Sequence, residues 1–525
     1  AFITACVIPH LWHVIQGARY QRQGGQHFNP YTYEDIRTIA DHAHYVGDIK
    51  DHAWWGHEPH AAGATLDAGG GHAHCGGMIY LGDNWPDEYR NHIFFNNVHG
   101  NRVNCDLLEP VAGSSAWVGH HGRDLLLAND HYFRGINLRY GPDGTVYLID
   151  WYDKNACHRT NPEVWDRTNG RIYRISWGAA EVVPVDASKW GVTELLEAHE
   201  HRNEWHSRMA RKQIMEKGCP DPLAESLWQW AADARQPQQT RLRCLWSLHA
   251  SKGLTEAQAQ TLLRDSDEYM RAWVIQLELE DQQISGSLLA KLEELGAKDA
   301  SPVVRLYLAS ALQRLPLESR TGLAAALSMH ESDAADHNLP LMLWYGLEPT
   351  VIADPEAALA IAEQTKIEKL RRFIIRRASG DNSSLPAVVA LLGRTDAVDQ
   401  QRLILEEMMA SCEGRVDIPM PDSWKSAYDV LQKSDQEEIR DRADQLAVLF
   451  GDRRVFGTMR RLLGDTGAVT DRRQKALSVL VKGQDRESAD TLLSDAVLSQ
   501  PELQGPAIRA LSTLGNDRTP TVLLK

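Results

Sequence analysis

The sequence predicts a protein in two parts: a strand-rich part over residues 1–180 and a helical part over residues 191–525, joined by a linker at 181–190. Three observations support this fold class. Residues 1–180 hold 16 of the 22 histidines and many Gly, Asn and Trp residues, whereas the remainder is rich in Leu, Ala, Glu and Arg. Short apolar runs between turn residues, typical of strands, fill the first part. Amphipathic runs with a period of 3.6 residues fill the second.

Turn residues divide the strand-rich part into short segments. Gly141-Pro142-Asp143-Gly144 is the clearest turn, because Pro presets φ and Asp-Gly accepts positive φ, so a hairpin is expected over Gly135–Asp150. A helix is predicted at Thr32–Tyr45, where a capping pattern follows Asn-Pro. Regularly spaced short strands with aromatic residues between them are typical of a propeller or a sandwich. The predicted strands are Met78–Leu81, His92–Asn96, Arg102–Leu107, Asp124–Ala128, Gly135–Tyr140, Thr145–Asp150 and Gly170–Ile175.

The helical part has a recurring register. Arg241, Arg271 and Arg305 each open an apolar helix, and they lie 30 and 34 residues apart. Paired helices at this spacing predict an α-solenoid of HEAT-like repeats, which would serve as a concave binding surface or as a spacer. The predicted helices are Glu194–Lys217, Asp221–Asp233, Thr240–His249, Glu256–Leu263, Glu268–Leu279, Ser285–Leu295, Val303–Leu315, Lys369–Ala378, Asp399–Ala410 and Glu438–Leu449.

Composition argues against several classes of function. The net charge of −15 is unfavourable for a nucleic-acid partner, and no apolar run is long enough to span a bilayer. The seven cysteines are scattered and odd in number, which does not indicate a disulfide framework. Lys154 stands where a c-type haem motif ending in Cys157-His158 would need its first cysteine. The chain has no initiator Met or signal peptide, so we expect it to be an internal piece of a longer protein.

A glycine-rich stretch, Gly69–Tyr80, is the most distinctive segment. Its three leading glycines permit a tight turn or a close approach to another group. His72 and His74 are two residues apart, so on a strand both imidazoles would face the same side. Because a buried strand follows, the pattern predicts a site at the end of a sheet. The alternative is a tight turn with two surface histidines.

These motifs resemble a large bacterial family of membrane-bound dehydrogenases, also described as PVC-type heme-binding proteins. The resemblance covers residues 1–178 and rests on His10, Gly24–Tyr31, Asp51–Glu58, Gly69–Gly76, Tyr80–Pro86, His99–Asn104, Gly141–Gly144, Asp150–Asp153, Cys157-His158 and Gly170–Tyr173. It implies a β-propeller related to glucose and sorbosone dehydrogenases, then HEAT repeats, then a cytochrome c domain. This chain would contain a partial β-propeller, made of the C-terminal blades, and part of the solenoid. A c-type haem is expected only on a domain that this chain lacks.

The resemblance also implies site residues. In the sugar dehydrogenases, basic residues of the late blades bind pyrroloquinoline quinone, and here His99 and Arg134 match those cofactor-binding positions. His99 stands where the family has a lysine, and a neutral imidazole binds a carboxylate less well than an ammonium group does. His72 and His74 map to the same axial mouth and are the candidate catalytic residues. The general-base histidine of those enzymes comes from an earlier blade and is not assigned here.

Oxidation of an alcohol needs a base for the hydroxyl proton and a cation beside the cofactor, and histidine and arginine supply these groups. The resemblance implies a periplasmic or cell-envelope dehydrogenase that acts on sugar-type alcohols and passes electrons to a quinone or to a haem partner, such as a cytochrome c domain or protein. An enzyme should gather its four candidate residues around one pocket. The first alternative, a non-catalytic binding or scaffold protein, can scatter them over the surface.

The second alternative is a metal-dependent hydrolase. Imidazole and thiolate ligands suit Zn or Cu, and carboxylates suit Ca²⁺. The candidate carboxylates for Ca²⁺ are Asp150 and Asp153. Their alternative role is to accept turn hydrogen bonds at the end of a strand. The candidate transition-metal ligands are His72, His74, Cys75, His57-Glu58, His120-His121 and Cys157-His158.

Overall fold

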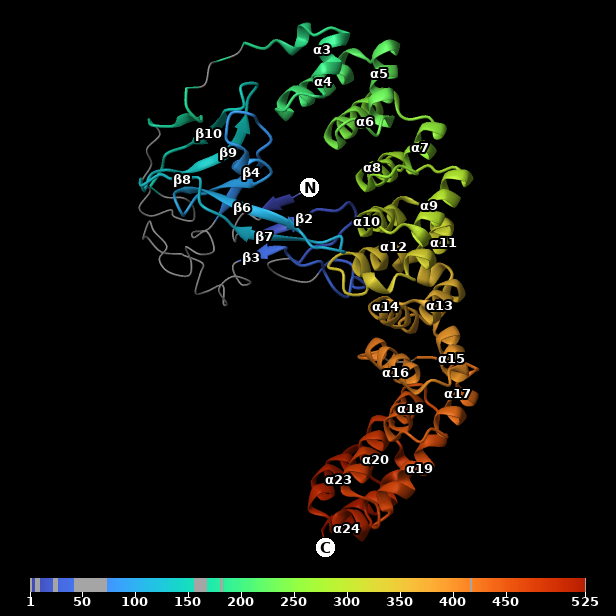
Figure 1. The fold of residues 1–525 in the computed structure, drawn as a ribbon. Coiled ribbons are helices and arrows are strands. Elements are labelled where there is room, and N and C mark those ends of the chain that lie inside the picture. The colour runs from blue at the N-terminus through green and yellow to red at the C-terminus, as the bar shows by residue number, and fades with distance from the viewer. Residues whose placement is uncertain are drawn as a thin grey trace. The chain divides into compact units, whose positions relative to one another are not determined.

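The structure is a computed structural model that describes residues 2–4, 10–21, 27–41, 73–154, 168–179, 182, 184–415 and 418–524. A small antiparallel strand region is followed by a large helical part (Figure 1). The described strands end at Ile175 and the described α-helices begin at Val192, where the composition changes. The chain divides into two compact units, Ala1–Gly346 and Leu347–Lys525. The strands therefore share a unit with the first helices.

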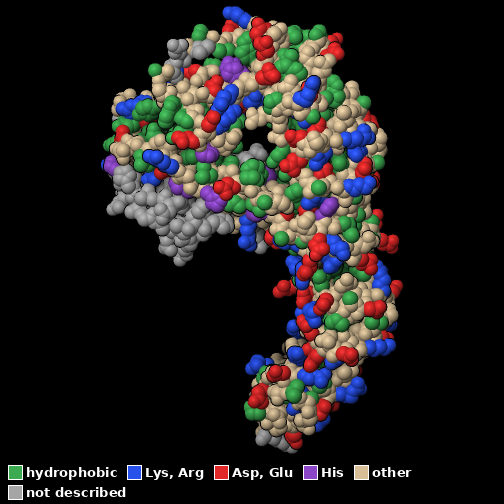
Figure 2. Space-filling view, viewed as in Figure 1, with side chains coloured by type: hydrophobic (Ala, Val, Ile, Leu, Met, Phe, Trp, Pro, Cys, Tyr) green, Lys and Arg blue, Asp and Glu red, His purple; other side chains and the backbone are tan. Residues whose placement is uncertain are grey.

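The strand region contains three antiparallel sheets. Three small sheets do not by themselves define a β-propeller. Several histidines lie over this region in Figure 2, whereas acidic and basic side chains are mixed over the helical elements. The first sheet consists of β1 (Phe2–Thr4), β2 (His10–His13) and β3 (Ala40–Asp41); the second of β4 (His74–Ile79), β5 (Ile93–Asn97), β6 (Arg102–Pro110), β7 (Trp117–His121) and β8 (Leu126–Leu127); and the third of β9 (Gly135–Tyr140), β10 (Val146–Asp150) and β11 (Arg171–Ile175).

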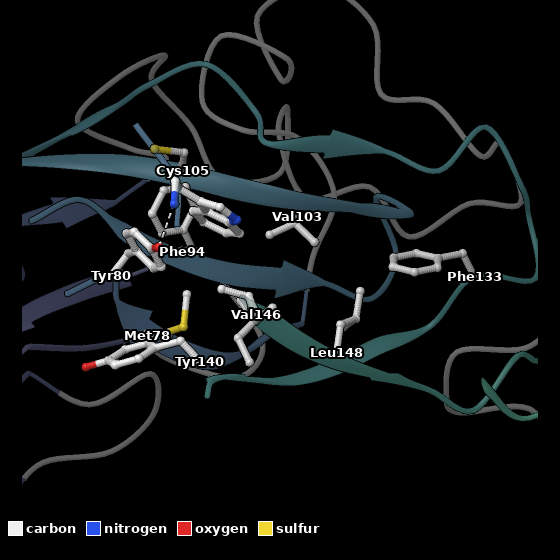
Figure 3. Close-up of a cluster of buried hydrophobic side chains, with 11 residues drawn as sticks. Met78, Tyr80, Phe94, Val103, Cys105, Phe133, Tyr140, Val146 and Leu148 are labelled. Atoms are coloured by element: carbon white, nitrogen blue, oxygen red, sulfur yellow. Dashed lines mark hydrogen bonds between the residues drawn. The ribbon is translucent and has the colours of Figure 1, made fainter. Parts of the chain in front are cut away.

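The second sheet is covered on both faces. Side chains alternate along β6, so Val103 and Cys105 point to one face, and Arg102, Asn104 and Asp106 point to the other. The apolar face packs on β9 and β10 and forms the cluster drawn in Figure 3. The opposite face packs through Ile93 and Phe95 on Leu11 of β2 and its neighbours. The members of the first cluster are Met78, Tyr80, Trp85, Phe94, Val103, Cys105, Phe133, Leu138, Tyr140, Val146 and Leu148.

The predicted hairpin over Gly135–Asp150 is confirmed, since β9 pairs with β10. Gly144 N–H donates to the carbonyl of Gly141 at 3.0 Å and closes the turn. Gly144 has a φ of 71°, and a Cβ there would lie 2.3 Å from Asp83 Oδ1, so glycine is required. The hydroxyl of Tyr80 donates to the Gly144 carbonyl at 2.9 Å and ties this turn to the second sheet.

The predicted helix at Thr32–Tyr45 is wrong over its described residues, because residues 32–39 are irregular and β3 follows at Ala40. The carbonyls that would form helical hydrogen bonds have other donors. Trp344 Nε1 donates to the Tyr31 carbonyl at 2.9 Å, and the Tyr345 hydroxyl donates to the Glu34 carbonyl at 2.8 Å. Tyr33 also has a φ of 59°, which is not helical. Residues 42–45 lie outside the described residues.

The other predicted helices are present, with one division. The segment Glu194–Lys217 forms two helices, α3 and α4, because Asn203 caps the second: its side-chain oxygen accepts from Trp205 N–H at 3.0 Å. Among the described residues, no helix combines the length and apolar character of a membrane span. The helices of the first unit are α3 (Val192–Glu197), α4 (Glu204–Lys217), α5 (Asp221–Ala232), α6 (Gln238–Lys252), α7 (Glu256–Leu262), α8 (Glu268–Glu278), α9 (Gly286–Lys298), α10 (Pro302–Ala311), α11 (Arg320–Leu327) and α12 (Leu339–Ala353), which crosses into the second unit.

In the first unit, α4, α6, α8 and α10 stack in one row, and α7, α9 and α11 stack in a second (Figure 1). The second unit has the same alternation. Its helices are α13 (Pro355–Gln364), α14 (Glu368–Ser379), α15 (Leu385–Arg394), α16 (Val398–Cys412), α17 (Trp424–Leu431), α18 (Glu437–Leu449), α19 (Arg454–Gly464), α20 (Thr470–Lys482), α21 (Ala489–Leu492), α22 (Asp495–Leu498), α23 (Pro501–Leu514) and α24 (Thr519–Leu523).

The recurring arginines have a common structural role. Arg271 Nε donates to Asp299 at 2.7 Å, and Arg305 Nε donates to Asp333 at 2.6 Å. Arg241 forms the equivalent ion pair with Asp265. In each case the arginine lies on one helix, and its aspartate comes after the end of the following helix. The ion pair therefore joins two successive helix pairs. The sequence register therefore reflects a repeated, largely buried ion pair.

Candidate functional site

The polar ends of the second and third sheets hold three of the four predicted site residues. His74 is the first residue of β4, His99 lies in the turn between β5 and β6, and Arg134 precedes β9. Val98 N–H donates to the Ala73 carbonyl at 3.2 Å, and Arg134 Nη1 donates to the Val98 carbonyl at 3.3 Å. These contacts bring the three segments to one place. His72 lies outside the described residues.

Arg134, the predicted clamp on a quinone carboxylate, donates to the backbone through both of its terminal nitrogens. Its Nη1 also donates to the Phe133 carbonyl at 2.8 Å, and its Nη2 donates to the Lys154 carbonyl at 2.7 Å. The residue is 6% exposed. Its guanidinium therefore bridges backbone segments, and it positions the turn that carries His99.

A row of buried polar residues crosses the second sheet at the same end. His74 is directly opposite Asn97 on β5, and Asn97 is directly opposite Arg102 on β6. All three are buried. Directly opposite residues share a face, and the His74 ring contacts the Phe95 ring edge-to-face at 5.0 Å. This row lies on the face of the sheet opposite to the cluster in Figure 3.

The row continues into an Asp–His–Asp cluster. Arg102 Nη1 donates to Asp124 Oδ2 at 2.9 Å, and Asn104 Nδ2 donates to Asp124 Oδ1 at 2.8 Å. His121, which ends β7, has Nδ1 3.0 Å from Asp106 Oδ1 and Nε2 3.5 Å from Asp124 Oδ1. The three side chains are between 11% and 14% exposed. The imidazole therefore lies between two carboxylates that solvent barely reaches.

Burial raises the pKa of both carboxyl groups. For Asp106 and for Asp124 the loss of solvent is the largest influence, and it outweighs the lowering effect of His121 and, at Asp124, of Arg102. Both carboxyl groups therefore hold a proton more tightly than a solvent-exposed aspartate does. Carboxyl groups with perturbed pKa values occur frequently in acid–base sites.

Backbone strain accompanies the polar strand ends. Ala73, directly before His74, has a φ of 61°, and Tyr152 has a φ of 54°. For a residue with a Cβ, the left-handed region costs about 1–2 kcal/mol. Asp150 Oδ1 accepts from the N–H groups of Arg134 and Tyr152 at 2.7 and 2.9 Å, which holds this strained segment. Strain of this kind concentrates at functional sites.

The described candidate ligands form no complete metal-binding set. Among the described residues, no group of three or more His, Cys, Asp or Glu side chains could hold a metal ion. Cys75 Sγ–H donates to the Gly135 carbonyl at 3.7 Å, and His120 Nε2 lies 3.6 Å from Glu109. Asp150 Oδ2 is buried and forms no hydrogen bond with a described residue, which leaves one oxygen for Ca²⁺. His57-Glu58 and Cys157-His158 lie outside the described residues.

The sequence contained a signal for Arg102, Asn104 and Asp106 that our prediction did not use. These residues alternate with Val103 and Cys105, so a strand over Arg102–Leu107 must carry charged and amide groups on one face. Both faces of this strand are covered, so those groups require buried partners. Asp124 and His121 come from the following loop and strand, and the alternation alone does not identify them.

Comparisons with known proteins add little about function. Residues 11–178 match the model of DUF7133, a domain of unknown function. No curated protein sequence matches this chain. Among solved structures, Escherichia coli YibA is 15% identical with a TM-score of 0.26, over 58% of this chain and 94% of YibA. Kap121p is 10% identical with a TM-score of 0.28, over 63% of this chain and 46% of Kap121p. The karyopherin Kap121p bound to the SUMO protease Ulp1p is 12% identical with a TM-score of 0.30, over 62% and 45% of the two chains.

Proposed function

We propose that the strand-rich part is a dehydrogenase-like module that oxidises sugar-type alcohols, with His121 as the base. The observation that carries this proposal is the 3.0 Å contact between His121 Nδ1 and Asp106 Oδ1. A carboxylate at Nδ1 favours the tautomer with a proton on that nitrogen, which leaves the Nε2 lone pair to accept a proton. The His121 side chain is 12% exposed, whereas His74 as a whole residue is only 1% exposed. His121 is therefore the better placed of the two to meet a substrate.

In this mechanism the hydroxyl proton of the substrate moves to His121 Nε2. Asp124 stabilises the imidazolium that forms, and Arg102 and Asn104 hold Asp124 in position. The hydrogen on the carbon leaves as hydride, so two electrons reach an acceptor. A bound quinone would supply that acceptor. In this proposal Arg134 does not hold the quinone, because its Nη1 and Nη2 donate to backbone carbonyls.

The proposed architecture is a partial β-propeller followed by HEAT-like repeats. Successive antiparallel sheets that pack face to face favour adjacent propeller blades. The alternating rows of helices and the repeated Arg–Asp pairs favour a solenoid. The DUF7133 match spans nearly the same residues as the resemblance to the dehydrogenase family. By that resemblance, the site would be periplasmic or in the cell envelope, with a cytochrome c domain or protein as the electron partner.

The test uses the protein with all of its natural flanking sequence. It is titrated with pyrroloquinoline quinone and Ca²⁺, and reduction of an artificial electron acceptor is followed with a panel of aldoses. We expect saturable quinone binding and aldose-dependent reduction of the acceptor. A folded protein with neither property would contradict the proposal, and it would favour a non-catalytic binding protein.

One observation favours that second candidate. In the second unit, α16, α18 and α20 surround a cavity of about 740 Å³. Its wall combines apolar side chains such as Val448 with charged ones such as Arg415 and Lys482. Concave cavities between stacked helices are typical binding sites of helical repeats. A role as a binding or scaffold protein therefore remains our second proposal.

A further inference from the structure

Helices of both units share a structural register, so positions on one helix can be compared with positions on another. In the helices that show it, the side chain of the fourth residue donates to the carbonyl of the residue six positions earlier. The distance is 2.8 Å from Arg305 Nη1 to the Asp299 carbonyl and 2.7 Å from Gln401 Nε2 to the Thr395 carbonyl. These register residues are Arg271 on α8, Arg305 on α10, Arg371 on α14, Gln401 on α16 and Arg440 on α18.

In the first unit, the positions that follow the register residue of α10 bind another part of the chain. The Ser310 hydroxyl donates to the Gln16 carbonyl at 2.7 Å. Gln313 Nε2, directly after the helix, donates to the Gly17 carbonyl at 2.9 Å. Gln16 and Gly17 lie in a turn between β2 and β3, and α12 contacts main-chain carbonyls within residues 31–34 in the same way (Figure 1). These helices therefore hold non-helical chain by its main-chain carbonyls.

In the second unit, the corresponding positions line the cavity of about 740 Å³ between α16, α18 and α20. Gln445 on α18 stands five residues after its register residue, as Ser310 does on α10. Val448 stands eight residues after it, the position that Gln313 takes at the end of α10. Met409 on α16, also eight residues after its register residue, lines the same cavity. The surface that binds chain in the first unit is thus matched by a cavity in the second.

Two polar side chains in the wall of this cavity are accessible to a ligand. Gln445 is partly exposed and forms no hydrogen bond with a described residue. Lys482, the last residue of α20, is exposed and forms no ion pair within the described part of the chain. On the same helix, Lys475 instead donates to Asp441 at 2.6 Å. An amide and a cation are therefore available at the cavity.

The chemistry of the wall fits a peptide. A glutamine amide both donates and accepts hydrogen bonds, so Gln445 can pair with a main-chain N–H and C=O. The apolar part of the wall, which includes Val448, suits an apolar side chain. The cations of Arg415 and Lys482 outnumber the one carboxylate of the wall, Glu413. An acidic side chain on the peptide is therefore favoured over a basic one.

We propose that this cavity binds a short non-helical peptide segment of a partner protein through the main chain of that segment. Gln445 would pair with a peptide group, Lys482 with an acidic side chain, and Val448 would contact an apolar one. A helical segment does not fit, because its carbonyls already accept hydrogen bonds within the helix. The inference rests on our second candidate function, a binding protein, and is independent of the dehydrogenase chemistry.

Selection of random short peptides displayed on phage, with the full chain as the target, tests this inference. Selected sequences are synthesised and titrated into the protein by calorimetry. We expect them to share an apolar residue near an acidic one and to bind without a gain of helical circular dichroism. Methylation of one main-chain nitrogen should greatly weaken binding, because Gln445 Oε1 would lose its donor.

Variants assign the binding to the cavity. Gln445→Leu keeps the approximate size of the side chain, removes its amide and should weaken binding about fivefold to tenfold. Lys482→Gln removes the exposed cation and should weaken binding several-fold at low salt and less at high salt. Gln474→Leu is the matched control, because Gln474 lies on α20, is exposed and does not line the cavity. It should leave the affinity unchanged.

Lys482 is exposed, so Lys482→Gln should not lower the melting temperature, and weaker binding by this variant would not reflect unfolding. Selected peptides that bind Gln445→Leu and Lys482→Gln as tightly as the wild type would overturn the inference and leave a binding role elsewhere. Peptides that become helical on the protein would also overturn it. Absence of any enriched peptide would contradict both this inference and the binding-protein candidate.

Discussion

His121 is a residue whose chemistry depends on its neighbours. Alone on β7, it would be an ordinary edge-strand histidine like His120, whose side chain is 48% exposed. Asp106 on β6 and Asp124 in the following loop remove it from solvent and face its two ring nitrogens. An imidazole that is fixed at Nδ1 and can gain a proton at Nε2 has the features of a general base.

A buried acid in the second unit gives a pH-dependent prediction. Burial raises the pKa of Asp444 to about 6, although hydrogen bonds from the Tyr428 hydroxyl and Gln432 Nε2 oppose this. The folded state therefore binds the proton more tightly than the unfolded state. Asp444 therefore stabilises the fold fully at a pH below 3.8, the pKa of the group in the unfolded chain. This contribution is lost as the pH rises through about 6.

We expect Asp444→Asn to remove this pH dependence, because Asn keeps the Oδ1 acceptor and does not ionise. At pH 7 the variant should be more stable than the wild type by about 2 kcal/mol. Hydrogen exchange of α17 and α18 at pH 4.5 and pH 7 measures the effect locally. Equal pH dependence in the two proteins would show that Asp444 is not a buried acid of this kind.

At the scale of the element, the repeated Arg–Asp pairs give the helical part its register. The Arg305 and Asp333 side chains are 4% and 3% exposed, so this pair is sealed from water. Removing one partner leaves a buried charge without compensation, at a cost of about 3–5 kcal/mol. We therefore expect Arg305→Gln to lower the melting temperature of the first unit by several degrees.

The control for this prediction is Arg235→Gln. Arg235 also pairs with an aspartate, Asp233, but its side chain is 91% exposed, so little change is expected. The measurement is thermal unfolding followed by circular dichroism. Similar destabilisation by the two substitutions would show that burial of the ion pair does not determine its contribution.

Elements with a clear local period were predictable from the sequence, and those fixed by distant residues were not. Helix α14 and the hairpin β9–β10 follow from 3.6-residue periodicity and from turn chemistry. The segment Thr32–Tyr45 has local helix signals, yet Trp344 and Tyr345, about 300 residues later, occupy its carbonyls. Long-range hydrogen bonds of this kind override a local propensity and leave no pattern near the segment.

The candidate site could be predicted in part for the same reason. The glycine-rich stretch points to His74, whereas His99 and Arg134 follow only from the resemblance to the sugar dehydrogenases, and the structure brings the three to one end of the sheets. The contacts of Arg134 Nη1 and Nη2 with backbone carbonyls leave no pattern in the sequence. Asp106, His121 and Asp124 become neighbours through strand pairing, which is a property of the fold.

At the scale of the whole molecule, one aspartate joins the strand region to the helices of the first unit. Asp336 accepts hydrogen bonds from Ser114 Oγ at 2.5 Å, from Ser115 N–H at 2.7 Å and from Ser115 Oγ at 2.8 Å. Burial alone would raise the pKa of Asp336, but these hydrogen bonds and two from the start of α12 hold it below its ordinary value.

Because the pKa of Asp336 is lowered in the folded protein, its hydrogen bonds stabilise the fold above pH 3.8, the pKa of the group in the unfolded chain. This stabilisation is lost as the pH falls below that value. We expect the loop at 111–116 to exchange its amide hydrogens faster below about pH 4. Asp336→Asn should reproduce this loosening at pH 7, at a cost of about 1–3 kcal/mol. Unchanged protection of the loop in the variant would show that Asp336 does not hold the two elements together.

The most direct test of our account compares two adjacent histidines in the acceptor-reduction assay. His121→Gln should lower aldose-dependent turnover about 10²–10⁴-fold, the usual contribution of a general base. His120→Gln, a change at the half-exposed neighbour, should leave turnover nearly unchanged. Both variants should bind the quinone as the wild type does. Equal turnover in the wild type and His121→Gln, with both proteins folded, would contradict the assignment of His121 as the base.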